Sequence, residues 1–400
     1  MVNFRTVDDI NVSGKRVLVR ADLNVPMLEG KVTDTSRLDR LILTINDLAQ
    51  RGAKVVVLSH FGRPNGQVVS SLTLKPVADA LATCLGRAVM FVNDCIGKVA
   101  SEAIERLAEG DIVVLENLRF HVGEEKNDEE FAAALAQLGD IYINDAFSAS
   151  HRYHASISKL PQLLPCAAGR FMQEELNALN ITLTEPDRPL TAIVGGAKIS
   201  TKIDLLENLT KKVDTLVIGG AMANTFLNAA GVSIGKSLCE HGMANTANEI
   251  MVAASDSNCK IILPVDAIVA MKFEKDSVHS NVSINSVPAD QMILDVGPKT
   301  VSLLCKTVRN SKTIVWNGPL GAFELSPYDL GTVALAQFTA DITDKGYITS
   351  IAGGGDTVAA LNHAGIADKF SYVSGAGGAF LEWLEGKKLP GVEALNILSK

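Results

Sequence analysis

The chain has 400 residues, of which 47% are hydrophobic and 20% are charged, and its formal net charge at pH 7 is −8. This length allows two or three domains, and an acidic balance without a lysine- or arginine-rich block argues against nucleic acid and anionic membranes as partners. No stretch approaches the roughly 18 unbroken apolar residues of a membrane span, and the N-terminus lacks a secretory signal pattern, so we expect a cytoplasmic protein. Any positively charged site must therefore be local.

Short runs rich in valine and isoleucine alternate with longer amphipathic segments along the first half of the chain. Between these runs, apolar residues recur at helical spacing, as in 38–49 and 77–85, which places them on one stripe of a helix. This alternation is typical of repeated βα units and predicts an α/β fold with a parallel sheet. The expected strands are 16–20, 53–58, 111–115 and 140–143.

A connection between two lobes is expected between residues 161 and 189. There QLLPCAAGR and TEPDRP flank FMQEELNALNITL, whose pattern indicates a single helix. The strand and helix alternation then resumes, and the total strand count is too high for one compact sheet. The expected strands of the second half are 191–194, 214–218, 260–263, 312–315, 347–351 and 370–373.

Cationic residues in the first half stand just past expected strands or at a helix start. In a parallel sheet, ligands bind outside the carboxyl ends of the strands, so these side chains can gather round one cleft. Any one of them alone could be a solvated charge, since charged side chains are usually exposed. Their shared placement predicts a site for an anion, built from Arg20, Arg37, His60, Arg63, Arg119 and Arg152.

Glycine-rich turns follow four expected strands of the second half. We expect the first turn, GGAKISTK, to open a helix with Lys198 and Lys202 stacked on one face. Asp356 adds a carboxylate where a metal-bridged nucleotide would need one. One such turn could be an ordinary strand-to-helix connection, but four in one sheet would align backbone N–H groups along a polyphosphate. The turns are GGAKISTK at 195–202, Gly219-Gly220, GGGDTVAAL at 353–361 and SGAGGAFLEWL at 374–384.

Two nucleotide-binding patterns are incomplete. AGVSIGKS at 230–237 has Ala230 in the first glycine position of a P-loop and follows a helix-like segment, so we expect a surface loop. GAGGAF places Phe380 in the last position of GxGxxG, which weakens a nicotinamide-dependent dehydrogenase as an alternative. A noncatalytic phosphometabolite-binding protein is a second alternative, although it would have no use for both Lys198 and Asp356.

Cysteine and histidine spacing gives no disulfide or zinc signal. The six cysteines include no CxxC pair and stand in a chain too large to need disulfides, so we expect reduced, mostly buried thiols. His151 and His154 flank Arg152, but no cysteine, histidine and aspartate grouping has the spacing of a zinc site. We therefore interpret these histidines as ordinary loop residues.

Longer motifs in both halves resemble phosphoglycerate kinase. The resemblance spans essentially the whole chain and implies two Rossmann-like parallel-sheet lobes joined by a long helix and a hinge. It implies a first lobe at 1–170, a connecting helix and hinge at 171–188, and a second lobe at 189–386, with the tail 387–400 packing back on the first lobe. The motifs are RADLNVP at 20–26, SHFGRP at 59–64, LENLRFHVGEE at 115–125, NDAFSASHRYHAS at 144–156, GGAKISTKI, IGGAMANTF at 218–226, DVGPKT at 295–300, WNGPLGAFE at 316–324, GGGDT and LEWLEGK.

The resemblance also implies a reaction and its site residues. It implies an enzyme, a phosphotransferase with a carboxyl acceptor, that moves a phosphoryl group reversibly between ATP and 3-phosphoglycerate, giving ADP and 1,3-bisphosphoglycerate, with Mg²⁺ as cofactor, lobe closure and a monomeric state. The implied phosphoglycerate-binding residues are Asp22, Asn24, Arg37, His60, Arg63, Arg119 and Arg152. The implied nucleotide-binding residues are Gly196, Lys198, Lys202, Gly219, Gly220, Asn317, Pro319, Glu324, Gly354, Gly355, Asp356 and Thr357, with Asp356 on the metal. The implied catalytic residues are Arg37, Lys198, Gly355 and Gly378.

The chemistry of that reaction explains why the sequence offers no obvious catalytic base. The accepting carboxylate has a pKa of roughly 3.5 and is already ionised at pH 7, so nothing needs deprotonation. The reaction needs alignment and charge stabilisation, and we expect Arg37 and Lys198 to flank the transferring group from opposite lobes.

Two short segments depart from the family pattern. Ser374-Gly375-Ala376-Gly377-Gly378 replaces the usual Ser-Thr-Gly-Gly-Gly, and Ala376 fits only if its backbone avoids positive φ. Ser148-Ala149-Ser150 replaces Gly-Thr-Ala beside Arg152.

Overall fold

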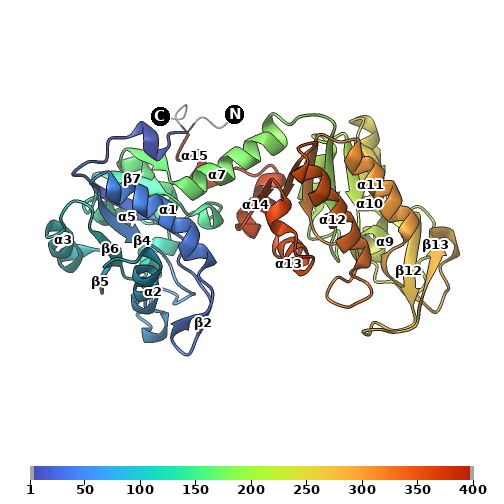
Figure 1. The fold of residues 1–400 in the computed structure, drawn as a ribbon, viewed down its shortest axis with the longest axis horizontal. Coiled ribbons are helices and arrows are strands. Elements are labelled where there is room, and N and C mark those ends of the chain that lie inside the picture. Colours follow the sequence, from blue (N-terminus) through green and yellow to red (C-terminus); the bar gives the residue numbers. More distant parts are fainter. Residues whose placement is uncertain (1–3, 397–400) are drawn as a thin grey trace. The chain divides into compact units, whose positions relative to one another are not determined.

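The computed structural model describes residues 4–396. The chain divides into two compact units, one formed by Met1–Asn177 with Lys388–Lys400 and the other by Ala178–Lys387 (Figure 1). Each unit contains one six-stranded sheet flanked by helices, and the two are described separately below.

The sheet of the first unit has the strand order β5-β6-β4-β1-β7-β8, and all of its pairings are parallel. The central strands are buried almost throughout, as expected for a parallel sheet covered on both faces. The strands are β1 (Arg16–Arg20), β4 (Lys54–Leu58), β5 (Met90–Val92), β6 (Ile112–Leu115), β7 (Ile141–Asn144) and β8 (Cys166–Ala168), and the helices are α1 (Ser36–Gln50), α2 (Lys75–Leu85), α3 (Gly97–Glu105), α4 (Val122–Glu125), α5 (Glu129–Ala136) and α6 (Leu160–Leu163).

The apolar stripe predicted in the first helix packs on this sheet. Leu38, Leu41, Ile45 and Leu48 of α1 are buried in one core cluster with the valines of β1 and β4. Their spacing puts them on a single helix face, so burying that face orients α1 and fixes the position of its first turn, which carries Arg37.

The connecting helix follows the first sheet directly. α7 (Arg170–Leu179) continues into a π-helical turn, Asn180–Thr184, so the predicted single helix is present. At its start, Arg170 pairs with Asp47 at 2.6 Å and with Asp8 across 2.5 and 2.6 Å, and Asp145 Oδ1 accepts a hydrogen bond from Met172 N at 3.0 Å. These contacts join the N-terminus of α7 to the first unit.

The sheet of the second unit has the order β11-β10-β9-β15-β16-β17 and is also parallel. Its strands are β9 (Leu190–Val194), β10 (Thr215–Ile218), β11 (Lys260–Ile262), β15 (Thr313–Asn317), β16 (Thr349–Ala352) and β17 (Tyr372–Val373). Its helices are α8 (Ile203–Thr210), α9 (Gly220–Ala229), α10 (Ala244–Asp256), α11 (Pro298–Arg309), α12 (Leu330–Asp344), α13 (Gly355–His363) and α14 (Gly377–Leu384).

Several strands were not predicted. The second unit has an additional antiparallel sheet of β12 (Asp266–Ala270), β13 (His279–Ser283) and β14 (Met292–Val296), and the first unit has a short hairpin of β2 (Met27–Leu28) and β3 (Lys31–Val32). β5 and β8 also lie outside the predicted strands, and they form the two edges of the first sheet. β2, β3, β5 and β8 have only two or three residues and β13 is polar, so their periodicity is weak, whereas β12 and β14 are apolar segments that the sequence analysis did not assign to strands.

The C-terminal segment contacts the first unit. Gly391 N donates to Ser150 O at 2.9 Å, and Asn144 Nδ2 donates to Gly391 O at 3.3 Å, on the short helix α15 (Pro390–Glu393). Residues 397–400 of the expected tail, and residues 1–3, lie outside the described residues. Among the helices that are described, none is both long and apolar enough to cross a membrane.

No disulfide joins any of the six cysteines, all of which lie among the described residues. Cys95, Cys166 and Cys259 are buried, whereas Cys84, Cys239 and Cys305 are partly exposed. The expectation of reduced cysteines is confirmed, but only half of them are fully buried.

Candidate active site

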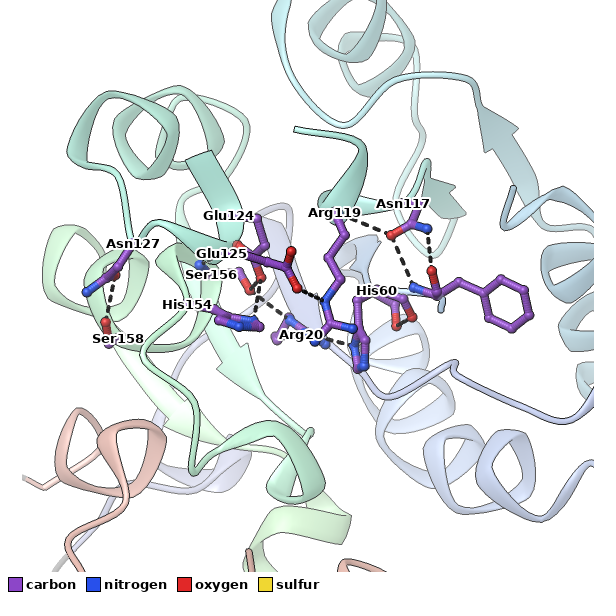
Figure 2. A network of polar contacts seen from close by, with 12 residues as sticks. Arg20, His60, Asn117, Arg119, Glu124, Glu125, Asn127, His154, Ser156 and Ser158 are labelled. Atoms are coloured by element: carbon purple, nitrogen blue, oxygen red, sulfur yellow. Dashed lines mark hydrogen bonds and ion pairs between the residues drawn. The ribbon is translucent and has the colours of Figure 1, made fainter. Parts of the chain in front are cut away.

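Cationic residues of the first unit converge at the carboxyl ends of three neighbouring strands. Arg20 ends β1, His60 follows β4, and Arg119 lies in the 3-10 turn Leu118–Phe120 after β6. All three are buried, and Figure 2 shows them side by side. Asn117 holds two of these strand ends together, because its Oδ1 accepts from Phe61 N and Arg119 N, both at 3.1 Å. The sequence analysis did not single out Asn117.

Arg20 stabilises this cluster through hydrogen bonds in the protein interior. It is fully buried, donates to Ser156 Oγ at 2.9 Å and places Nη2 at 3.2 Å from His60 Nδ1. Because guanidinium can only donate, His60 Nδ1 is the acceptor and Nε2 carries the ring proton. Arg20 therefore fixes the tautomer of His60.

Arg119 is an incompletely satisfied buried cation. The residue is 2% exposed, Nη1 donates to Gly62 O at 2.7 Å, and Nε lies 3.2 Å from Glu125 Oε1 as an ion pair. Among the described residues, neither Nε nor Nη2 finds a hydrogen-bond partner. Burial first, and then the charge of Arg152, lower the pKa of Arg119 to about 10. A buried donor without a partner costs free energy unless a ligand satisfies it.

The histidines of this cluster are neutral. Burial is the main cause that lowers the pKa of His60 well below its ordinary value, and it lowers the pKa of His154 to about 3. The charges of Arg20, Arg119 and Arg152 act in the same direction on both rings. This concentration of positive charge, which Glu124 and Glu125 offset only in part, favours a bound anion.

The remaining predicted residues of the first unit lie at different depths. Arg152 is partly buried, and its charge acts on Arg119 and both histidines, whereas Arg63 is exposed. Asn24 Oδ1 accepts from Gly62 N at 2.9 Å, so Asn24 holds the loop that follows β4. The structure thus joins Arg152 and Asn24 to the cluster more closely than Arg63.

Arg37 forms a second cationic point near the start of α1. Its Nη1 lies 2.6 Å from Asp22 Oδ2, and its side chain is 41% exposed against 11% for Asp22. Asp22 Oδ2 also accepts from Ser148 Oγ, and Asp22 Oδ1 accepts from Asn24 N at 3.1 Å. The serine that replaces the usual glycine at position 148 thus supports the aspartate that holds Arg37.

In the second unit, glycine turns bring the ends of three strands into backbone contact. A Cβ at Gly195 would lie 1.8 Å from Pro319 O, and one at Gly220, where φ is +65°, would lie 2.5 Å from Gly196 O. Gly220 N donates to Leu320 O at 2.8 Å. These turns need glycine because backbones, and not side chains, form the floor of the site.

Lys198 and Lys202 do not lie on a helix. α8 begins only at Ile203, and Lys202 is its capping residue with φ −134°, so the predicted stacking of the two lysines on one helix face is wrong. Lys202 Nζ instead donates to Gly195 O at 2.6 Å and to Asn317 Oδ1 at 2.7 Å, whereas Lys198 is exposed. Lys198 lies in the turn that precedes α8, so the two side chains do not share a helix face.

The third and fourth glycine turns start neighbouring helices. Gly354, with φ +98°, precedes α13, which begins at Gly355, and a Cβ added at Gly377, at the start of α14, would lie 3.5 Å from Gly355 N. The predicted catalytic Gly378 is the second residue of α14. Thr357 Oγ1 accepts from Gly318 N at 2.6 Å and Asn317 Nδ2 donates to Gly353 O at 2.9 Å, which ties these turns to β15.

The substitution at position 376 is compatible with this turn. Ala376 has φ −115°, so its Cβ meets no left-handed backbone penalty, as the prediction required. Its N–H donates to Ser374 Oγ at 3.2 Å.

A cavity of about 470 Å³ opens beside the glycine turns. This volume suits a small-molecule ligand. Five predicted residues line it, namely Gly196, Gly220, Pro319, Glu324 and Asp356. Its apolar wall includes Leu238, Phe273, Met292 and Leu294, which the sequence analysis missed. Met292 and Leu294 lie on β14, in the antiparallel sheet that was not predicted.

Lys202 predicts a pH dependence of anion binding in this unit. Burial lowers the pKa of Lys202 to about 8, and Asp356 partly opposes that shift. Between about pH 8 and 10.5 the native protein binds fewer protons here than the unfolded chain, so this group makes the free energy of unfolding rise with pH. The affinity for a polyphosphate should instead fall as the pH rises, by up to tenfold per pH unit above pH 8, because we expect binding to require the ammonium form of Lys202.

The measurement is the dissociation constant of Mg-ADP from about pH 7 to pH 9.5. The Lys202→Arg variant stays charged and should lose this dependence. Constant wild-type affinity over the range would contradict the role of Lys202.

The chain is similar to phosphoglycerate kinases in sequence and in structure. A family model described as phosphoglycerate kinase matches residues 7–387. The chain is 58% identical over 397 residues to the phosphoglycerate kinase of Methylorubrum extorquens (strain PA1) and 58% identical over 396 residues to that of Rhizobium meliloti (strain 1021), covering 99% of each chain. A phosphoglycerate kinase structure from Coxiella burnetii superimposes with a TM-score of 0.93 at 42% identity over the whole of both chains, and one from Pyrococcus horikoshii OT3 with 0.80 at 30% identity over 98% of both.

Proposed function

The chain belongs to the phosphoglycerate kinase family, and from this premise we propose how its residues divide the reaction. The enzyme transfers a phosphoryl group reversibly between ATP and the carboxylate of 3-phosphoglycerate, giving ADP and 1,3-bisphosphoglycerate. The dehydrogenase and the noncatalytic binding protein are not favoured as alternatives.

We propose that the first unit binds the phosphoglycerate through its cationic cluster. The observation that carries this proposal is Arg119 Nη2, a buried donor among concentrated positive charge for which residues 4–396 offer no hydrogen-bond partner. A phosphate monoester would accept from Arg119 Nη2 and from His60 Nε2–H, with Arg63 and Arg152 adding charge. Asn24 and Asp22 would position the loops that carry these residues.

We propose that the second unit binds the nucleotide. The backbone N–H groups at the starts of α13 and α14 suit phosphate oxygens, and Gly355 and Gly378 lie at these starts. Lys202 would hold Gly195 and Asn317 in place and add one positive charge. The adjoining cavity, with Glu324, Pro319, Gly219 and Gly220 at or beside its wall, is the proposed site for the nucleoside.

We propose that Arg37 and Lys198 supply charge stabilisation in the transfer step. The nucleophile is a carboxylate already ionised at neutral pH, so no residue has to remove a proton. What lowers the barrier is the spreading of negative charge from the transferring group onto fixed cations and backbone donors. The exposure of Arg37 and Lys198 leaves both side chains able to reach a ligand.

Trapping of the acyl phosphate product tests the assignment of the reaction. Incubation with Mg-ATP, 3-phosphoglycerate and hydroxylamine should give a hydroxamate, because hydroxylamine attacks acyl phosphates. A control without 3-phosphoglycerate should give none. Absence of hydroxamate from folded, ATP-binding protein would overturn the assignment.

We propose that Asp356 holds Mg²⁺ together with the nucleotide phosphates. Its exposed carboxylate at the first turn of α13 lines the cavity and fits the usual Mg²⁺ site of one or two carboxylates plus phosphate oxygens. When bound, Mg²⁺ would neutralise phosphate charge and orient the terminal phosphate.

Metal removal is expected to stop the reaction. Chelation with EDTA should abolish turnover and added Mg²⁺ should restore it, and Asp356→Asn should raise the Mg²⁺ concentration for half-maximal rate by about tenfold or more. The matched control is Asp368→Asn, at an exposed aspartate in the same unit. An unchanged Mg²⁺ requirement in Asp356→Asn would exclude Asp356 as a ligand.

We also propose that the enzyme is a monomer of the cytoplasm. Each unit buries its own core within a single chain, and each proposed ligand site is complete within one unit. Analytical ultracentrifugation tests the first point, and a mass of two chains would contradict it.

A further inference from the structure

Three potential metal ligands meet on the side of the first unit near Arg119. Asp94 and Cys95 follow the edge strand β5, and His121 follows the turn Leu118–Phe120. One ligand atom from each residue lies within 4.8 Å of the other two, and His121 Nε2 lies 2.8 Å from Asp94 Oδ1. His121 is far from Asp94 and Cys95 in the sequence, so a search for zinc-site spacing did not find this group.

We propose that Asp94, Cys95 and His121 bind one thiophilic divalent transition-metal ion, such as Zn²⁺, separately from the Mg²⁺ that accompanies the nucleotide. Thiolate, imidazole and carboxylate are the ligands that Zn²⁺ and Co²⁺ take in proteins, whereas Mg²⁺ prefers oxygen alone. Tetrahedral metal bonds of about 2.0–2.3 Å place ligand atoms roughly 3–4 Å apart. The group therefore needs only a small contraction, with water as the fourth ligand.

The three side chains are already oriented. Asp94 Oδ1 accepts from Cys95 N at 2.7 Å, which fixes the carboxylate beside the thiol. The His121 ring stacks on Phe131, with centroids 5.3 Å apart and an interplanar angle of 29°. Such supporting contacts reduce the ordering cost of metal binding.

Burial and charge also suit a cation at this place. Cys95 is fully buried, whereas the side chains of Asp94 and His121 are 41% and 31% exposed, so an ion can enter past them and reach the thiol. The carboxylates of Glu116 and Glu124 add negative charge around the Cys95 thiol, and a negative field favours a divalent cation.

Metal binding releases one proton, from the Cys95 thiol, and leaves the His121 ring neutral. The Cys95 thiol releases its proton to solvent and its sulfur forms the metal bond, while neutral His121 binds through the Nε2 lone pair with its proton on Nδ1. The contact between His121 and Asp94 is replaced by a metal bond to each residue.

Cobalt spectroscopy tests this site. Chelator-treated, nucleotide-free enzyme titrated with Co²⁺ should bind one equivalent with a near-ultraviolet thiolate-to-cobalt band and visible bands of a four-coordinate ion. Cys95→Ser should abolish the thiolate band, and His121→Gln should weaken Co²⁺ binding by about tenfold or more. Phosphoglycerate kinase activity, measured with Mg²⁺ but without added Co²⁺, checks that both variants are folded.

The matched control is Cys239→Ser, because Cys239 Sγ lies 3.7 Å from His241 Nδ1 and forms the competing cysteine and histidine pair. This variant should retain the full spectrum. A thiolate band that persists in Cys95→Ser, a band lost in Cys239→Ser, or no thiolate band in the wild-type enzyme would each overturn the proposal.

Discussion

Replacing Arg37 with alanine should lower kcat by about 10²–10³-fold while changing the KM for 3-phosphoglycerate by only a few-fold. An interaction made chiefly with the developing charge of the transition state affects turnover more than ground-state binding, and the loss of one such donor typically costs about 3–4 kcal/mol. Arg37 suits this role because it is 41% exposed and oriented by Asp22 at 2.6 Å, so it is positioned but available to a ligand. Steady-state kinetics with both substrates varied give the two constants.

Arg16 provides the matched control for this substitution. It pairs with Asp140 at 2.7 Å with comparable exposure, but at the other end of β1. Arg16→Ala should leave kcat and KM essentially unchanged. If Arg37→Ala raised only KM, Arg37 would bind substrate without stabilising the transition state.

Replacing Arg119 with methionine should raise the KM for 3-phosphoglycerate by about 10²-fold or more and also raise the unfolding midpoint of the ligand-free enzyme. The lost charge-assisted hydrogen bonds to phosphate explain the first effect. The second follows because burial lowers the pKa of Arg119 to about 10, and this shift corresponds to a cost of about 3 kcal/mol for holding the charge there. Methionine removes the buried charge, so we expect the free energy of unfolding to increase even though the contacts to Gly62 O and Glu125 are lost.

Arg170→Met is the opposite case and serves as control. Arg170 is held by Asp8 and Asp47, and those partners raise its pKa. Its loss should lower the unfolding midpoint and leave substrate affinity nearly unchanged. Urea unfolding of the two variants decides the matter: destabilisation by Arg119→Met as large as that by Arg170→Met would show that Arg119 is a structural residue.

Most strands that the sequence predicted are buried central strands, although the predicted β11 and β17 lie at the edges of the second sheet and are only partly buried. RVLVR and KVVVL form adjacent central strands in parallel register, because continuous valine and leucine runs have few other ways to be buried. β8 and β17 were harder, since three or two residues carry no period. The antiparallel sheet was missed because β13, HSNVS, is polar and mostly exposed.

The candidate site was predictable to the extent that it depends on strand ends and glycine turns. The burial of each side chain was not predictable, since nothing in the sequence distinguishes Arg20, which is fully buried, from Arg63, which is exposed. The start of α8 was also misplaced, because a glycine turn can precede a helix by several residues, and this removed the predicted alignment of Lys198 with Lys202. The role of Ser148 became clear only from the structure, in which its hydroxyl donates a hydrogen bond to Asp22.

Separate calorimetric titrations with 3-phosphoglycerate and with Mg-ADP test most directly the claim that each unit binds one reactant. The wild-type enzyme should bind both ligands, Arg119→Met should lose only 3-phosphoglycerate affinity, and Lys202→Met should lose only Mg-ADP affinity. Loss of Mg-ADP binding in Arg119→Met, or of 3-phosphoglycerate binding in Lys202→Met, would contradict this division.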